Sequence, residues 1–154
     1  MLQHWEAEGV NTDLVLSDPD RQPGLYLIQL DDTGERTFLY WRNQSPARYL
    51  VQHPDFNKVS KALQGTDMVY LSGITLAILP PEDRYRLIET LTKLRQQGTE
   101  IAFDSNFRSA LWESTNAARH FYQLVFAITD LPWSPMMMNR RFGVISMKNK
   151  PSPD

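Results

Sequence analysis

The stretch Asp104-Ser-Asn-Phe-Arg108 places a carboxylate, a hydroxyl, an amide and a guanidinium within five positions. It directly follows Ile101-Ala-Phe103, an apolar run that is typical of a buried parallel strand. In open α/β sheets, ligands bind just beyond the carboxyl ends of the strands, so this stretch is a candidate binding site. The alternative is an ordinary loop in which Asp104 or Asn106 caps the next helix. On the pattern alone, that alternative is favoured.

The elements around this stretch alternate between helices and strands. Short apolar runs predict buried strands at 68–71 and 101–103. Apolar residues at helical spacing predict helices from Asp55 or Asn57 to Leu63, from Pro81 to Gly98, and over 115–126. This order predicts an α/β fold, a partial doubly wound parallel sheet with flanking helices and right-handed crossovers.

A β-hairpin is predicted before this alternation. Residues 24–30 and 36–42 are rich in β-forming side chains, and they flank the turn-forming Asp31-Asp-Thr-Gly-Glu35. A further strand is predicted at 13–17. Side chains alternate between the two faces of a strand, so Tyr26 shares one face of the first hairpin strand with Ile28 and Leu30.

Composition excludes several classes of function. With 42% hydrophobic and 22% charged residues, the 154-residue chain is globular, and it is long enough for one domain. A net charge of −2 gives no electrostatic case for nucleic acid or an anionic membrane. Cysteine is absent, and His4, His53 and His120 lack metal-ligand spacing. The absence of an apolar run of ~20 residues or a signal pattern predicts a cytoplasmic protein.

Several motifs together resemble the ribokinase-like PfkB carbohydrate kinases, and within that family the 2-keto-3-deoxygluconate kinases. They occur in family order and at family spacing, and they cover nearly everything up to Asp130. The motifs are Glu8-Gly-Val-Asn-Thr-Asp13, Pro23-Gly-Leu-Tyr-Leu-Ile28, Thr33-Gly-Glu-Arg-Thr-Phe38, Tyr40-Trp-Arg42, Tyr70-Leu-Ser-Gly-Ile74, Phe103-Asp-Ser-Asn-Phe-Arg108 and Leu111-Trp112.

The resemblance implies a kinase domain with a small β lid that transfers the γ-phosphoryl group of ATP, with Mg²⁺, to a sugar hydroxyl. It implies that Tyr26, Tyr40, Arg42 and Arg108 line the sugar-acid site, and that Asn106 and Arg108 lie beside the nucleotide phosphates. The chemistry agrees, because a planar guanidinium binds a carboxylate through two charge-assisted hydrogen bonds. An arginine between two anionic reactants also offsets charge during phosphoryl transfer.

Three alternatives remain open from the sequence. Tyr26 and Tyr40 could be cross-strand packing partners, and Arg42 could simply be solvated. The sugar could be neutral, such as fructose or ribose, although neutral sugars do not need two guanidinium groups. The chain could also be a non-catalytic module that binds a sugar acid or forms a homo-oligomer through its lid hairpin, because hairpin edges can pair with other chains.

The resemblance also implies motifs that these 154 residues do not contain. The family places a Gly-Gly sugar-binding motif earlier and a catalytic Asp, in a Gly-Ala-Gly-Asp anion hole, later in its chain. The seven glycines of this sequence are scattered singly. We therefore assign no catalytic residue and expect a fragment that is inactive in isolation.

The expected organisation is a partial sugar-kinase domain over 1–130, with a lid-like β segment at 13–42 and an α/β core at 55–130. From 131 to 154 the periodicity is lost. Met136-Met-Met-Asn139 has nearly forced codons, and another reading frame of the same bases encodes Asp-Asp-Glu. We therefore expect residues 131–154 to be a frameshifted, poorly ordered tail that does not fold on the core.

Overall fold

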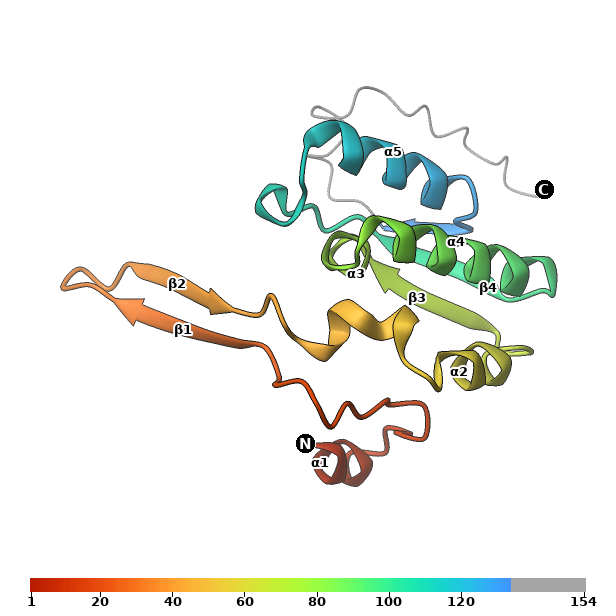
Figure 1. The fold of residues 1–154 in the computed structure, drawn as a ribbon, viewed down its shortest axis with the longest axis horizontal. Coiled ribbons are helices and arrows are strands. Elements are labelled where there is room, and N and C mark those ends of the chain that lie inside the picture. The colour runs from red at the N-terminus through yellow and green to blue at the C-terminus, as the bar shows by residue number, and fades with distance from the viewer. Residues whose placement is uncertain (134–154) are drawn as a thin grey trace, which may run out of the picture.

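The computed structural model describes residues 1–133 and shows a small α/β layer with a long hairpin projecting from it (Figure 1). No helix within this range is long and apolar enough to cross a membrane. The helices are α1 Leu2–Ala7, α2 Phe56–Ala62, α3 Gly73–Ile78, α4 Pro81–Gln96 and α5 Thr115–Phe126, with 3-10 helices η1 Pro46–Gln52 and η2 Ser109–Leu111. The strands are β1 Leu25–Leu30, β2 Arg36–Trp41, β3 Met68–Ser72, β4 Glu100–Asp104 and β5 Leu131–Trp133.

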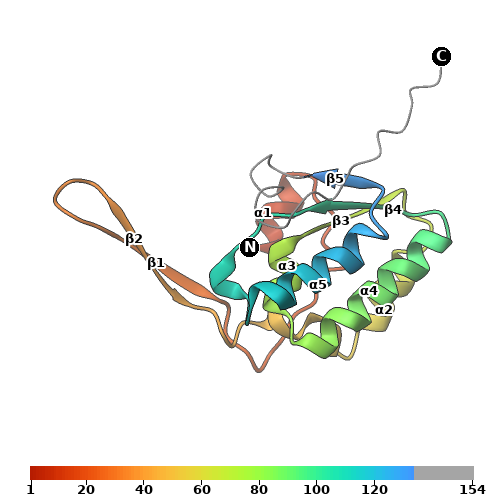
Figure 2. The ribbon, with the colours of Figure 1, turned by 90° about the horizontal axis from the view of Figure 1, so that it is seen from above.

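Three parallel strands in the order β3-β4-β5 form the central sheet. Helices α4 and α5 cover one face, and Ile101 and Phe103 of β4 are fully buried there (Figure 2). The predicted strand at 68–71 is confirmed, but it is not buried throughout. Met68 and Tyr70 are 45% and 62% exposed, because they lie on the face that α4 and α5 do not cover.

The third strand, β5, corrects the expectation that the chain leaves the core at Leu131. Leu131 pairs with Ala102 in parallel register, and Asp130 fixes the entry to the strand. The Asp130 carboxylate accepts hydrogen bonds from the Ile101 amide at 3.0 Å and from the Arg95 guanidinium at 2.8 Å. This anchoring of Asp130 to α4 and β4 was not visible in the local sequence pattern. Residues 134–154, where the rest of the predicted tail falls, lie outside the described residues.

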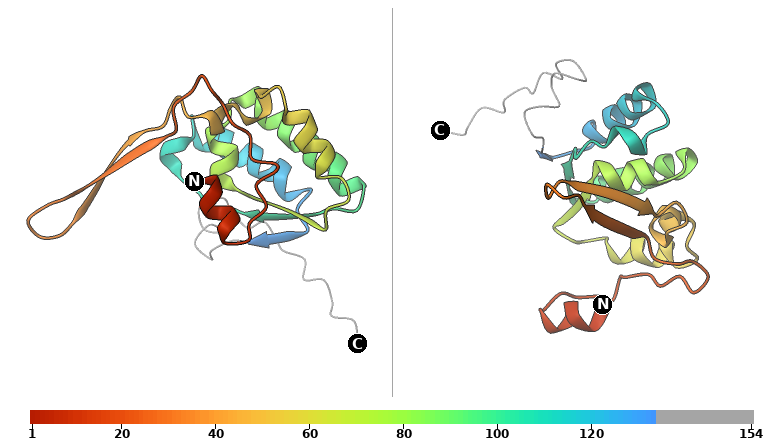
Figure 3. Two further views of the ribbon diagram at one scale, coloured as in Figure 1. Left: turned by 90° about the horizontal axis from the view of Figure 1, so that it is seen from below. Right: turned by 90° about the vertical axis from the view of Figure 1, so that its left-hand side faces the viewer.

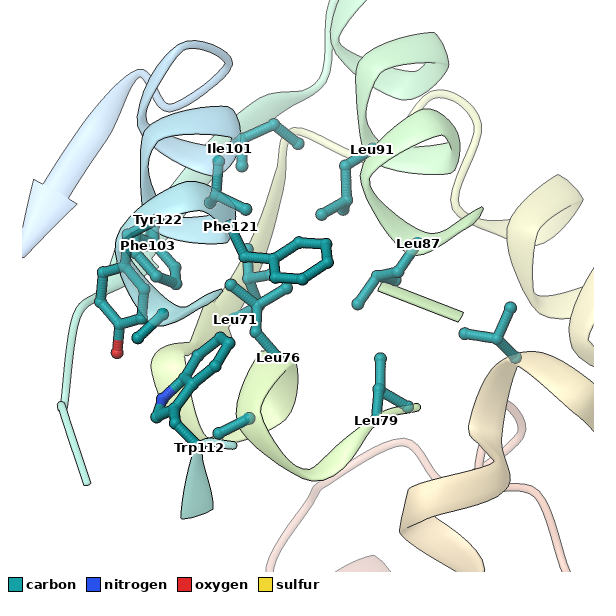
Figure 4. Close-up of a cluster of buried hydrophobic side chains, with 14 of the residues drawn as sticks. Leu71, Leu76, Leu79, Leu87, Leu91, Ile101, Phe103, Trp112, Phe121 and Tyr122 are labelled. Carbon is teal, nitrogen blue, oxygen red and sulfur yellow. The ribbon is translucent and has the colours of Figure 1, made fainter. Parts of the chain in front are cut away.

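The hydrophobic core lies between the sheet and its covering helices (Figure 4). It is built from the apolar stripes of α4 and α5, the inward residues of β3 and β4, and α3. Its members include Leu71, Leu76, Leu79, Leu87, Leu91, Ile101, Phe103, Trp112, Phe121 and Tyr122. The core confirms the predicted α/β architecture, because apolar residues at the predicted helical spacing, among them Leu87, Leu91 and Phe121, meet in it.

The hairpin and the amino-terminal segment lie outside this core (Figure 3). Strands β1 and β2 pair antiparallel, as predicted, yet every residue of both strands is exposed. The strand predicted at 13–17 is wrong. The amide of Val15 bonds to the Thr12 carbonyl at 2.9 Å, and the amide of Asp13 bonds to the Asn11 side chain at 2.8 Å. These local bonds hold the backbone in a turn instead of a ladder.

A buried arginine on α4 ties together three parts of the layer. The Arg84 guanidinium donates to the carbonyls of Leu76 at 2.9 Å and Ala77 at 3.3 Å, near the end of α3. It also binds the Glu113 carboxylate at 2.6 Å and lies 4.6 Å from the centre of the Trp112 ring. The hydrogen bond to Arg84 lowers the pKa of Glu113, and partial burial of the carboxylate opposes that shift.

Candidate functional site

Residues 104–108, polar except for Phe107, form a loop that begins at the last residue of β4, where the sequence predicted a site. The Asp104 carboxylate accepts hydrogen bonds from the backbone amide of Asn106 at 3.1 Å and from the Tyr70 hydroxyl at 3.3 Å. Asn106 has a φ of 24°, within the left-handed region that non-glycine residues seldom adopt. The loop is therefore folded by specific polar contacts.

The helix-capping alternative for this loop is wrong. Neither Asp104 nor Asn106 caps α5, because the 3-10 helix η2 intervenes after Arg108. The amino terminus of α5 is capped instead by Ser114, whose hydroxyl accepts from the Ala117 amide at 3.1 Å. The polar groups of Asn106 and Arg108 are thus not used for capping α5, and the Arg108 side chain is exposed.

The hairpin residues named by the resemblance lie together on one face. Tyr26 is directly opposite Tyr40 across the strands, with ring centroids 6.4 Å apart. The Arg42 guanidinium lies 4.0 Å from the centre of the Tyr40 ring, a cation–π distance. This is the geometry of cross-strand packing, yet Tyr26 and Tyr40 remain 59% and 51% exposed. Exposed rings beside a guanidinium form a surface that is open to a polar ligand.

The five predicted site residues form two groups. Tyr26, Tyr40 and Arg42 lie on the hairpin, whereas Asn106 and Arg108 lie on the loop after β4. Within residues 1–133, no hydrogen bond, ion pair or ring contact joins the two groups. The hairpin projects from the same end of the α/β layer toward which β3 and β4 run (Figure 1). Their assignment to one sugar-acid site remains a prediction.

The two loop residues suit an anionic nucleotide but not a metal ion. The side-chain amide of Asn106 and the exposed guanidinium of Arg108 can donate hydrogen bonds to phosphate oxygens, so both residues fit the phosphates of ATP. Among residues 1–133, no group of three acidic, histidine or cysteine side chains could hold a metal ion. We therefore assign no Mg²⁺ ligand to this part of the chain.

The sequence did not reveal the buried residues that pack against the loop and hold it in place. Ser105 is fully buried, and its carbonyl accepts a hydrogen bond from the hydroxyl of Tyr122 on α5. Gly73, at the start of α3, lies against both groups. Tyr122 belongs to the predicted apolar stripe of α5, but helical spacing cannot tell which core residue uses its hydroxyl. The sequence signal that could have indicated this hydrogen bond was a tyrosine within an otherwise apolar stripe.

Known protein sequences match this chain over most of its length. The family described as pfkB family carbohydrate kinase matches residues 1–131. The chain is 62% identical over 122 residues to a 2-dehydro-3-deoxygluconokinase of Haemophilus influenzae, covering 79% of this chain and 39% of that protein. It is 45% identical over 131 residues to one of Dickeya dadantii, covering 85% and 42% respectively. The chain thus spans about two fifths of the length of these curated relatives.

Solved structures give the same picture of the fold. A PfkB family carbohydrate kinase of Listeria grayi superposes with a TM-score of 0.75 and 26% identity, covering 96% of this chain and 45% of its own. A PfkB protein of Polaromonas sp. JS666 has a TM-score of 0.78 at 21% identity, covering 92% and 46%, which is a likeness of fold alone. The partial ribokinase-like fold inferred from the motifs is confirmed.

Proposed function

Because the chain belongs to the pfkB family of carbohydrate kinases, we propose that it forms the lid and part of the α/β core of a 2-keto-3-deoxygluconate kinase. Such an enzyme transfers the γ-phosphoryl group of ATP to a hydroxyl of the sugar acid. The 62% identity to the Haemophilus influenzae enzyme carries this proposal. By contrast, identity to a fructokinase of Vibrio alginolyticus is 25% over 126 residues, so the acidic sugar is favoured over fructose.

The proposed roles follow from the chemistry of the two groups. Arg42 and Arg108 would bind the carboxylate of the sugar acid, and Tyr26 and Tyr40 would offer hydroxyls and ring faces to the sugar. Asn106 and Arg108 would bind the phosphates of ATP. Bound Mg²⁺ would neutralise phosphate charge. In this proposal the residues of this chain bind and orient the reactants, and the base that activates the sugar hydroxyl is not among them.

A chimaeric kinase tests the proposed function. Residues 1–131 replace the matching segment of the Haemophilus influenzae 2-dehydro-3-deoxygluconokinase, and ATP-dependent phosphorylation of 2-keto-3-deoxygluconate, fructose and ribose is measured. We expect turnover with a clear preference for the sugar acid. The 154-residue polypeptide alone is expected to give no turnover above a no-enzyme control. A folded chimaera that prefers fructose or ribose would contradict the assigned substrate.

The hairpin supports a second proposal, that two copies of this chain associate through it. The face opposite Tyr26 and Tyr40 carries the cross-strand pairs Leu25–Trp41 and Leu27–Leu39, whose side chains are 40–62% exposed. An exposed apolar face on a two-stranded ribbon favours burial against a partner. Packing through this face would leave the tyrosine face free for the sugar acid.

Solution size measures this association. We expect light scattering after size-exclusion chromatography to give twice the monomer mass, and Leu27→Lys to shift the chain toward the monomer. Gln29→Lys is the matched control, because Gln29 is an exposed polar residue on the same strand and face. A wild-type chain that is monomeric at high micromolar concentration would refute the proposal.

A further inference from the structure

The ring of Tyr122 lies beneath the loop formed by residues 104–108. It contacts an aromatic residue before the loop, one within it and one after it. The centroid of the Tyr122 ring is 5.5 Å from that of Phe103, 6.3 Å from that of Phe107 and 5.7 Å from that of Trp112. Tyr122 is only 2% exposed, and its ring gathers with those of Phe103 and Trp112 at one end of the core (Figure 4). One side chain thus contacts the loop and residues on both sides of it in the sequence.

The hydroxyl of Tyr122 adds a polar anchor to these contacts. It donates a hydrogen bond to the Ser105 carbonyl within the buried interior. Burial raises the pKa of the Tyr122 hydroxyl, and the nearby Asp104 charge raises it further, so the donor proton is retained at neutral pH. A Cβ on Gly73 would overlap both the Ser105 carbonyl oxygen and the Tyr122 hydroxyl, and it would lie 2.9 Å from the ring carbon that bears the hydroxyl. Glycine is therefore the residue that leaves room for this bond.

The next residue shows why the anchor matters. Asn106 follows Ser105 directly and holds a φ of 24°, a strained conformation for a non-glycine residue that persists only where the surroundings fix it. The Ser105 side chain gives no such support, because its buried hydroxyl oxygen has no hydrogen-bond partner in the described part of the chain. The Ser105 backbone is instead held by Tyr122.

We propose that Tyr122 is a positioning residue, which acts through the Ser105 carbonyl to hold Asn106 and Arg108 toward the reactants. The inference rests on the proposed function, because it presumes that these two residues contact the phosphates and the sugar acid. Tyr122 is buried and would itself contact no reactant, because the loop that its hydroxyl binds would lie between. Loss of its hydroxyl leaves the ring packing in place and removes only the bond to the loop.

The first test uses the full 154-residue chain and hydrogen–deuterium exchange. In Tyr122→Phe, we expect amide exchange across residues 104–108 to accelerate about tenfold relative to the wild type, with little change in β4. Val125→Ala is the matched control: Val125 is fully buried one turn along α5, so its truncation weakens the same helix packing without touching the Ser105 bond. It should leave loop exchange unchanged relative to the rest of the chain.

The second test measures kinetics in the chimaeric kinase. Tyr122→Phe is expected to lower kcat about 10- to 100-fold, because a displaced Arg108 misaligns the reactants. Val125→Ala, even at an equal or lower melting temperature, should retain kcat. Gly73→Ala should reproduce the Tyr122→Phe defect, and the double variant should show less than the product of the two single effects, since both act on the same bond.

The outcomes separate the two proposals. If the chimaera phosphorylates the sugar acid but Tyr122→Phe matches Val125→Ala in both loop exchange and kcat, Tyr122 is only a core residue and the positioning role is overturned. If the unsubstituted chimaera is folded but inactive, the proposed function fails. The exchange experiment then still decides whether Tyr122 fixes the loop.

Discussion

Replacing Arg84 with alanine is expected to lower the free energy of unfolding by about 3–5 kcal/mol. The change removes the guanidinium donor from the carbonyls of Leu76 and Ala77, and a buried carbonyl left without a partner costs about 1–3 kcal/mol. The Leu76 carbonyl keeps its hydrogen bond from the Leu79 amide at 3.2 Å, so this cost falls on Ala77. The change also removes the guanidinium that packs on the Trp112 ring at 4.6 Å. Such a loss is a large fraction of the stability of a small domain, so urea denaturation followed by tryptophan fluorescence should detect it easily.

Two control variants separate the buried role of Arg84 from charge in general. Arg86→Ala, on the same helix, removes an exposed side chain whose ion pair with Asp83 is 3.6 Å long, and it should cost less than about 1 kcal/mol. Glu113→Gln keeps a hydrogen-bond acceptor for Arg84 but removes the charge, so its effect should lie between the two. If Arg84→Ala lowered the free energy of unfolding no more than Arg86→Ala does, the hydrogen bonds from Arg84 to α3 would contribute little to stability.

The fold was largely predictable because it follows from local periodicity. The apolar stripe of 115–126 predicted α5 at the bounds found in the structure, and the hairpin was marked by a turn between two β-rich runs. The Arg84 cluster was not predictable in this way. Its three partner segments are joined only by tertiary packing, and an arginine on an amphipathic helix is ordinarily solvated.

The predictions that failed also did so because contacts outside the local pattern decided the structure. Val15 and its neighbours have strand propensity, but the bonds made by Asn11 and Thr12 compete successfully with a ladder. The strand at Leu131 is three residues long, too short for periodicity to reveal, and it depends on the contacts of Asp130 with α4 and β4. The loop after β4 was located correctly from its polar cluster. The hydrogen bond from Tyr122 that holds this loop joins residues 17 positions apart in the sequence, so local spacing could not predict it.

In the chimaeric kinase, Arg108→Ala is expected to lower kcat/KM for 2-keto-3-deoxygluconate by at least about 100-fold. A planar guanidinium that contacts both a carboxylate and phosphate oxygens makes several charge-assisted hydrogen bonds, each contributing about 1.5–3 kcal/mol. Alanine removes all of them, and water screens the two anionic reactants poorly in a closed site. Arg108→Lys keeps the charge but not the fork, so it should recover only part of the loss.

The matched control is Arg119→Ala, which removes an exposed arginine from the outer surface of α5 and should leave both kinetic constants unchanged. Whether Arg108→Ala changes KM or kcat then identifies which reactant group Arg108 contacts. A higher KM for the sugar acid with kcat retained indicates carboxylate binding in the ground state, whereas a lower kcat indicates charge compensation during transfer. If Arg108→Ala had kinetics identical to Arg119→Ala, Arg108 would have no role at the site. The half-buried hairpin arginine, Arg42, would then be the remaining guanidinium for the sugar carboxylate.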